Sequence, residues 1–216
     1  MGLIPIDPTA DIILKLASIL TVKGGTGSII EYYGEGAQTL SPTAMSTIGN
    51  MGAEVGATTT IFPYNSSVAE YLQKTERQHI IDEAKPYLGQ LHADKGCEYD
   101  QHIHIDLNTL EPHINGPYSP DISQPISKFA EFIKGSNSPS DISAALIGSC
   151  TNSSYEDLSR ASGIAGEALK AGLKTSTSFF VAPGSEEIRA TVDRDGIFDN
   201  LTQAGGTLLA NACGAW

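Results

Sequence analysis

The loop from Gly148 to Ser154 has the residue types of a reactive site. It reads Gly-Ser-Cys-Thr-Asn-Ser-Ser, so a single thiol, Cys150, stands among small polar side chains. The apolar run 142–147 before it predicts a strand, and the periodic pattern of 155–171 after it predicts a helix. A thiol near a helix N-terminus is favoured as a thiolate, because the amide groups there stabilise negative charge. The alternative is a tight turn in which Cys150 is a small buried apolar residue.

Asn50 and Glu54 form a second polar pair, at the end of a predicted helix over 41–53. They are spaced i, i+4 and therefore share one helix face. The helix is rich in small residues, Gly49 and Gly52 among them, which would let a ligand approach it closely. A carboxylate enclosed at such a place could move protons at neutral pH. The alternative is an ordinary solvated helix face.

Two histidines lie in the stretch 99–107, whose alternating pattern predicts a strand. Ile103 and Ile105 would face one side of this strand, and His102 and His104 the other. Two histidines on one strand face could ligate a metal ion. Because no third ligand is evident nearby, a half-exposed strand face is the favoured interpretation.

The elements around these residues alternate between helix and strand. Helices are predicted at 11–20, 41–53, 68–74, 78–88, 127–134, 155–171, from the cap at 183–187 to 192, and at 197–204. Strands are predicted at 28–33, 58–62, 99–107, 142–147, 176–181 and 207–210. This alternation predicts an α/β fold of three layers, with mostly parallel sheets covered by helices on both faces. Ligands in such sheets gather beyond the carboxyl ends of the strands, and Cys150 and Cys213 both follow a strand.

The proline-rich stretch 111–125 has little apolar periodicity and predicts a linker. We therefore expect two small α/β units, 1–115 and 116–216, with the Cys150 loop in the second.

Composition narrows the classes of partner. The 216 residues include 13 Lys and Arg against 25 Asp and Glu, a net charge of −12, which excludes nucleic acid and anionic membrane surfaces as partners. Cys97, Cys150 and Cys213 are too sparse for a disulfide framework, which favours a reducing compartment. We see no membrane span and no signal or transit peptide, so a cytoplasmic protein is expected.

Several longer blocks of this sequence resemble the aconitases. The blocks are 22–27, 50–58, 62–65, 112–117, 148–157, 183–185 and 210–214. They occur in the order of the family and cover nearly all of the chain. The resemblance is to the second domain and the first half of the third domain of a full aconitase, which implies an aconitase-like α/β fold and makes the mitochondrial matrix an alternative location.

The resemblance also implies an iron–sulfur site. Aconitases hold a [4Fe–4S] cluster through three cysteines and leave one iron open, which acts as a Lewis acid on citrate or isocitrate. By position, Cys150 looks like the first ligand and Cys213 like the second. The family's third ligand completes a Cys-Gly-Pro-Cys motif, whereas residues 213–216 read Cys-Gly-Ala-Trp. No intact cluster and no other cofactor is therefore expected, and citrate–isocitrate interconversion by this chain alone is not expected.

Two functions fit these observations. The favoured one is a cluster-deficient, repurposed lyase or isomerase that carries out elimination, addition or isomerisation near a carboxylate or carbonyl of a small organic substrate. Glu54 would be its base, Cys150 a second base or nucleophile, and its substrate-binding residues would be Asn50, Thr151, Asn152 and Ser153. The alternative is a non-catalytic aconitase fragment that serves as a binding or assembly module, or as a subunit whose missing ligand comes from a partner chain. A homo-oligomer is left open.

Overall fold

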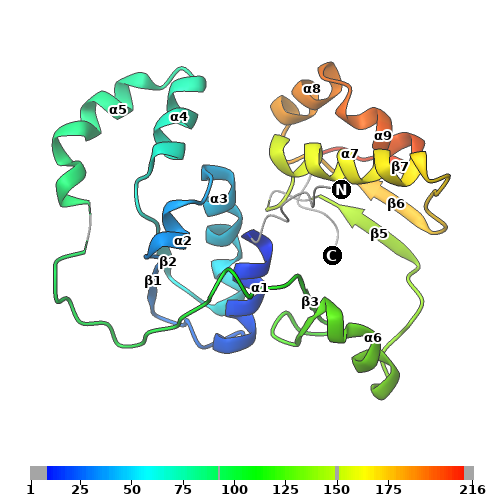
Figure 1. The fold of residues 1–216 in the computed structure, drawn as a ribbon, viewed down its shortest axis with the longest axis horizontal. Helices are drawn as coiled ribbons and strands as arrows, with labels where there is room; N and C mark the ends of the chain where they lie inside the picture. The colour runs from blue at the N-terminus through cyan, green and yellow to red at the C-terminus, as the bar shows by residue number, and fades with distance from the viewer. Residues whose placement is uncertain (1–8, 92, 149–150, 212–216) are drawn as a thin grey trace. The chain divides into compact units, whose positions relative to one another are not determined.

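The computed structural model describes residues 9–91, 93–148 and 151–211, and the chain divides into two compact units, 1–137 and 138–216 (Figure 1). Within the described residues both units combine short strands with helices, and the sheets β1–β2 and β5–β6–β7 are parallel. The predicted α/β class with mostly parallel sheets is confirmed. No helix of the described chain has both the length and the apolar character needed to cross a membrane.

Unit 1 contains most of the helices. Its elements are α1 (Thr9–Leu20), β1 (Ile29–Glu31), α2 (Glu35–Gln38), α3 (Pro42–Asn50), the 3-10 helix η1 (Met51–Val55), β2 (Thr59–Ile61), α4 (Ser66–Lys74), α5 (Gln78–Ala84), the 3-10 helix η2 (Lys85–Gln90), β3 (His113–Asn115), β4 (Ser123–Pro125) and α6 (Ile126–Gly135). The helices predicted from apolar periodicity are present, although most boundaries shift by a few residues.

The core of unit 1 forms where α1 packs against α3. The apolar stripe of α1 buries Ile13 and Leu16, and α3 contributes Ile48, which is fully buried. Helix α3 begins after Ser41, whose hydroxyl accepts a hydrogen bond from the amide of Ala44. Such an N-cap satisfies an amide that has no partner within the helix.

The predicted strand 99–107 is wrong, since these residues form no ladder with any strand that the structure describes. The alternation itself is real: Ile103 and Ile105 pack on the core of unit 1, while His102 and His104 are exposed. A period of two therefore records which side chains face the core, and it does not guarantee a neighbouring strand.

The predicted linker 111–125 instead contains the antiparallel pair β3–β4. The Asp11 carboxylate accepts a hydrogen bond from the amide of His113 at 2.7 Å, and the Asn115 side chain donates to the carbonyl of Leu14 at 3.1 Å. These bonds attach the hairpin to α1. The boundary predicted between residues 115 and 116 falls inside this hairpin, and the division between the compact units lies at 137/138.

Unit 2 is built on a three-stranded parallel sheet. Its elements are β5 (Ala144–Ile147), α7 (Tyr155–Lys170), β6 (Ser178–Val181), α8 (Glu186–Arg194), α9 (Ile197–Gln203) and β7 (Gly206–Leu208), and the strand order is β5-β6-β7. Because each crossover steps to the next strand in the same direction, right-handed connections place the helices on one face.

The core of unit 2 confirms this one-sided arrangement. Leu158 of α7, Val192 of α8 and Leu201 of α9 share one buried cluster with Phe179 and Val181 of β6. Phe180, between those two, points to the other face of the sheet, as the period of a strand requires. The described elements of unit 2 thus make two layers, with the helices on the Phe179 and Val181 side.

Helix α7 begins with a capping box. The Ser154 hydroxyl accepts a hydrogen bond from the Asp157 amide at 3.2 Å, and the Asp157 carboxylate accepts one from the Ser154 amide at 3.0 Å. Ser154→Ala should lower the free energy of unfolding by about 1 kcal/mol, because an orphan amide loses its partner. Urea unfolding measures this, with the exposed Ser140→Ala as the control that should change little; equal effects of the two changes would contradict the role of the cap.

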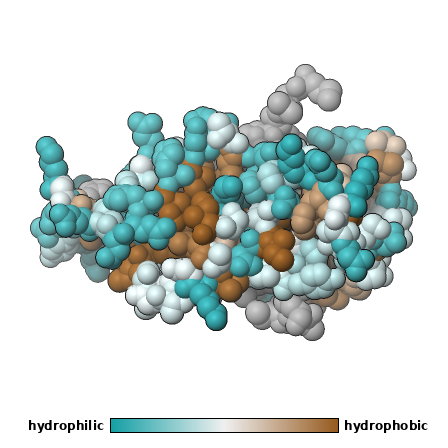
Figure 2. Space-filling model, turned by 90° about the horizontal axis from the view of Figure 1, so that it is seen from below, coloured by the Kyte–Doolittle hydropathy of each residue, from teal (hydrophilic) through white to brown (hydrophobic). Residues whose placement is uncertain are grey.

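Large apolar side chains also reach the surface of both units. Ile142 is 66% exposed and Ile164 is 65% exposed, and Ile29, Ile61 and Ile126 are exposed as well. Figure 2 shows apolar areas between polar side chains on the face drawn there. Such areas mark places where another protein surface can pack.

Candidate functional site

The carboxyl ends of β5, β6 and β7 meet at one edge of the sheet. The Ala182 amide donates to the Ile147 carbonyl at 2.9 Å, and the Leu209 amide donates to the Val181 carbonyl at 2.8 Å. These bonds continue the ladder just past the strands, so the loops after all three strands leave the sheet at this edge. This is where the parallel sheet was predicted to gather its reactive residues.

The loop after β5 begins with a close backbone approach. A Cβ atom on Gly148 would lie 2.7 Å from the carbonyl oxygen of Ala182, a distance that real Cβ atoms do not tolerate. On the far side of the loop, the Gly184 amide donates to the Ser153 carbonyl at 3.2 Å. The loops after β5 and β6 are therefore tied together at both ends of the 148–153 segment.

The predicted substrate-binding residues of this loop differ in exposure. Asn152 is exposed, Thr151 is half-buried, and Ser153 is only 1% exposed. Helix α7 follows after Ser154, and helix α8 follows after Ser185, whose hydroxyl accepts a hydrogen bond from the Ile188 amide. Two helix N-termini thus follow these loops, and their partial positive charge favours a bound carboxylate or thiolate.

Cys150 and Cys213, the predicted thiol ligands, lie outside the described residues. In the part of the chain that the structure describes, no three His, Cys, Asp or Glu side chains gather closely enough to hold a metal ion. His102 and His104 are therefore not part of a three-ligand metal site within the described residues. The Nδ1 atom of His102 is 2.8 Å from the Tyr33 hydroxyl.

Asn50 and Glu54 lie in unit 1, at the end of α3. Asn50 is the last residue of α3, Glu54 belongs to η1, and both are exposed. The structure thus replaces the predicted single helix over 41–53 by an α-helix and a 3-10 turn. Neither Asn50 nor Glu54 lines the cavity beside the core of unit 2 or the one beside β1 in unit 1.

The glycine-rich turn 24–27 positions the end of this element. The Gly25 amide donates to the Val55 carbonyl at 2.8 Å, and a Cβ atom on Gly25 would lie equally close to that oxygen. Thr26 also forms a bridge with Ala57. The turn therefore fixes the backbone next to Glu54, a role that spacing along the sequence did not reveal.

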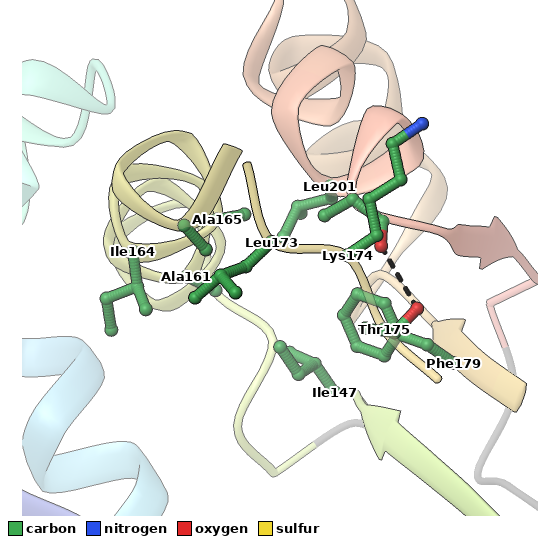
Figure 3. A pocket seen from close by; sticks show the side chains of 11 residues that line it. Ile147, Ala161, Ile164, Ala165, Leu173, Lys174, Thr175, Phe179 and Leu201 are labelled. Carbon is green, nitrogen blue, oxygen red and sulfur yellow. Dashed lines mark hydrogen bonds between the residues drawn. The ribbon is translucent and has the colours of Figure 1, made fainter. Parts of the chain in front are cut away.

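A cavity of about 280 Å³ opens beside the core of unit 2 (Figure 3). Apolar side chains of β5, α7 and α9 line it, Ile147, Ala161 and Leu201 among them. The Thr175 hydroxyl at its wall already donates to the carbonyl of Ala204. Among the described residues that line this cavity, Lys174 is the one ionisable side chain, so they do not provide the acid and base pair that proton transfer needs.

Comparison with known proteins identifies the family to which this chain belongs. The family model of the aconitase family (aconitate hydratase) matches residues 6–215. The chain belongs to the aconitase family.

The resemblance to the aconitases is thereby confirmed. The chain is 58% identical over 204 residues to a protein of Aspergillus fumigatus named "Aconitate hydratase, mitochondrial". The matched region covers 94% of this chain and 26% of that protein. The chain is 58% identical over 205 residues to the protein of the same name from Saccharomyces cerevisiae, with the same shares. A "Probable aconitate hydratase, mitochondrial" of Caenorhabditis elegans is 55% identical over 204 residues. The chain spans about a quarter of the length of these aconitase-family relatives.

Proposed function

We propose that this chain supplies part of the active site of an aconitase-type hydro-lyase, acting on a small carboxylate. The relatives that support this are named aconitate hydratases, enzymes of the hydratase type. In this proposal the chain contributes residues to a shared site and does not enclose a site of its own. This is closest to the alternative in which the chain is a subunit of a larger aconitase-like complex, and it is favoured here over a repurposed stand-alone enzyme.

The exposure of Asn50 and Glu54 carries this choice. A stand-alone base must be enclosed with its substrate, because bulk water competes for the proton and weakens every electrostatic contact. Glu54 and Asn50 are exposed, and they line neither the cavity beside the core of unit 2 nor the one beside β1 in unit 1. Exposed apolar residues such as Ile19 and Ile126 of unit 1 also suit a surface that further protein covers.

We assign roles by chemistry. Glu54 is the proton-transfer group, since a carboxylate is a competent general base near neutral pH. Asn50, one turn earlier, orients a carbonyl or carboxylate of the substrate. Within unit 2, Thr151, Asn152 and Ser153 are the candidates for binding a carboxylate beside the N-terminus of α7, and Cys150 is the second candidate for base or nucleophile. The reaction is elimination or addition of water. The two steps in succession amount to an isomerisation.

The thiols of this chain do not make a complete cluster site. Only Cys150 and Cys213 stand at ligand-like positions, and Trp216 occupies the place of the third ligand. A cluster held by three cysteines needs three thiolates, so we propose that no intact [4Fe–4S] cluster is held by these residues alone. No chemical step is therefore assigned to iron here.

Iron binding provides a direct test. Anaerobic reconstitution of the purified chain should give far fewer than about four irons per chain and no stable absorption band near ~400 nm, because the third thiolate is missing. A matched variant with Ala215→Pro and Trp216→Cys restores the family motif and should bind more iron. A full complement of iron in the unmodified chain would overturn the proposed ligand count.

We also propose the location and the partners from this family membership. The relatives are named mitochondrial, so the mitochondrial matrix is preferred here to the cytoplasm. The acidic composition supports neither nucleic acid nor an anionic membrane surface as a partner. A small carboxylate remains the proposed ligand.

A chimera tests the shared-site proposal. Residues 6–214 of this chain replace the matched region of the Aspergillus fumigatus relative, so that the relative supplies everything outside. Hydration of aconitate by the chimera, with no turnover by the chain alone, is the expected result. Turnover by the chain alone would favour the stand-alone enzyme, and an inactive but folded chimera would contradict the proposal.

A further inference from the structure

Unit 1 contains a second cavity, of about 370 Å³, that the proposed hydro-lyase site does not use. It lies between β1, the residues after β2 and the segment that ends at His102. Figure 1 shows this later segment passing beside β1. The residues that matter for its chemistry are Glu31, Tyr33, Phe62, Cys97, Tyr99 and His102.

Two of the residues that line the cavity, Tyr32 and Phe62, are stacked aromatic side chains. Tyr32 and Phe62 stack with their ring centroids 4.7 Å apart and an interplanar angle of 10°. Burial raises the pKa of Tyr32, so its phenol stays neutral. Both side chains belong to the partly buried layer on the core of unit 1. A flat apolar wall of this kind accepts a planar ligand.

A second group of lining residues is polar and is held by two hydrogen bonds between distant parts of the chain. The Tyr99 hydroxyl donates to Oε2 of Glu31 at 2.9 Å, and the Tyr33 hydroxyl lies 2.8 Å from Nδ1 of His102. The Tyr33 and Tyr99 rings are nearly parallel, and the His102 ring meets both edge-on. Glu31 is therefore fixed in a framework of aromatic rings.

The unused hydrogen-bonding capacity of this polar group of residues is that of an acceptor. Hydrogen bonds with Cys97 and then with Glu31 raise the pKa of Tyr99, so its hydroxyl proton stays on the oxygen and points to a partner. In the described residues, Tyr99 is the one side chain that donates to Glu31, and it does so at Oε2. Oε1 of Glu31 remains for a ligand that donates hydrogen bonds.

The negative charge near this cavity also favours a ligand that donates hydrogen bonds and carries a positive charge. Beyond Glu31, the segment that carries Cys97 and Tyr99 has Asp94, Glu98 and Asp100 against a single Lys95. A cation is attracted both by a carboxylate and by the faces of tyrosine rings.

We propose that this cavity binds a small planar organic cation, an amidine or a guanidine on an aromatic ring, with Glu31 as its charge partner. The ring lies against the Tyr32–Phe62 wall, and the cationic group donates to Oε1 of Glu31. This site is separate from Asn50 and Glu54, and it stands whether or not the hydro-lyase proposal holds.

Benzamidine is the probe, with benzamide as the neutral match and benzoate as the anionic match of the same shape. Binding is followed by NMR shifts of the backbone amides of the full chain. We expect benzamidine to shift Tyr33 and Tyr99 and to bind about tenfold more tightly than benzamide or benzoate, as one charged hydrogen bond would give. Equal binding of benzamidine and benzamide, shifts confined to unit 2, or no binding would each overturn the proposal.

Variants locate the charge partner. Glu31→Gln keeps the size of the side chain and should weaken benzamidine binding by about tenfold, while Glu167→Gln on α7 should leave it unchanged. Circular dichroism confirms folding of each variant. The comparison of the probes on the unmodified chain decides the matter if Glu31→Gln does not fold. A folded Glu31→Gln variant that binds benzamidine as tightly as the unmodified chain would overturn the assignment.

Discussion

Glu54→Gln should lower the turnover of the chimeric hydratase by about 10²–10⁴-fold, with little change in folding. The change keeps the shape of the side chain and removes its ability to accept a proton. Glu54 is exposed in unit 1, so its replacement costs no core packing. The expected loss therefore appears in turnover, measured as the steady-state rate of aconitate hydration at saturating substrate.

The matched control is Glu83→Gln, which is also an exposed carboxylate, on α5 of the same unit. Its turnover should equal that of the unmodified chimera. If Glu54→Gln behaves like Glu83→Gln while Cys150→Ser is inactive, the thiol is the catalyst and the ranking of the two residues is reversed.

Leu158→Ala should have the largest effect on stability, about 2–5 kcal/mol in the free energy of unfolding. Leu158 is fully buried, and it joins α7 to Phe179 of the sheet and to Leu201 of α9. Truncation removes its apolar contacts and leaves a cavity that its neighbours cannot close completely. Urea unfolding followed by circular dichroism measures the loss.

Leu173→Ala provides the comparison, because Leu173 is 61% exposed just after α7. The same chemical change there should cost well under about 1 kcal/mol. Similar losses for both variants would mean that the cluster around Leu158 does not support unit 2.

The sequence predicted those parts of the fold that are determined locally. The apolar stripe of α1 and the serine caps before α7 and α8 specify helices through residues three or four apart. The order of strands and helices after residue 138 predicted the parallel sheet, because parallel neighbours require crossovers. Short strands such as β7 were predicted near their positions, with boundaries off by a residue or two.

Features that depend on distant partners were not predictable in the same way. The prolines of 111–125 suggested a linker, yet the Asp11 and Asn115 hydrogen bonds attach that stretch to α1 across the chain. Glu31 and Tyr99 are 68 residues apart, and no periodicity connects them. The exposure of Glu54 likewise depends on what surrounds η1, which a spacing of i, i+4 cannot show.

Packing of side chains on the core and pairing of the backbone in a strand ladder usually occur together, but the stretch 99–107 has only the first. Its isoleucines pack on the core of unit 1, but no described backbone group pairs with residues 101–105. Amide hydrogens without partners exchange readily with solvent water, whereas those of a strand ladder are protected. Solvent deuterium should therefore enter this stretch as quickly as it enters a surface loop, although its apolar side chains stay in place. Slow hydrogen exchange is thus a poor guide to which parts of this chain support its core.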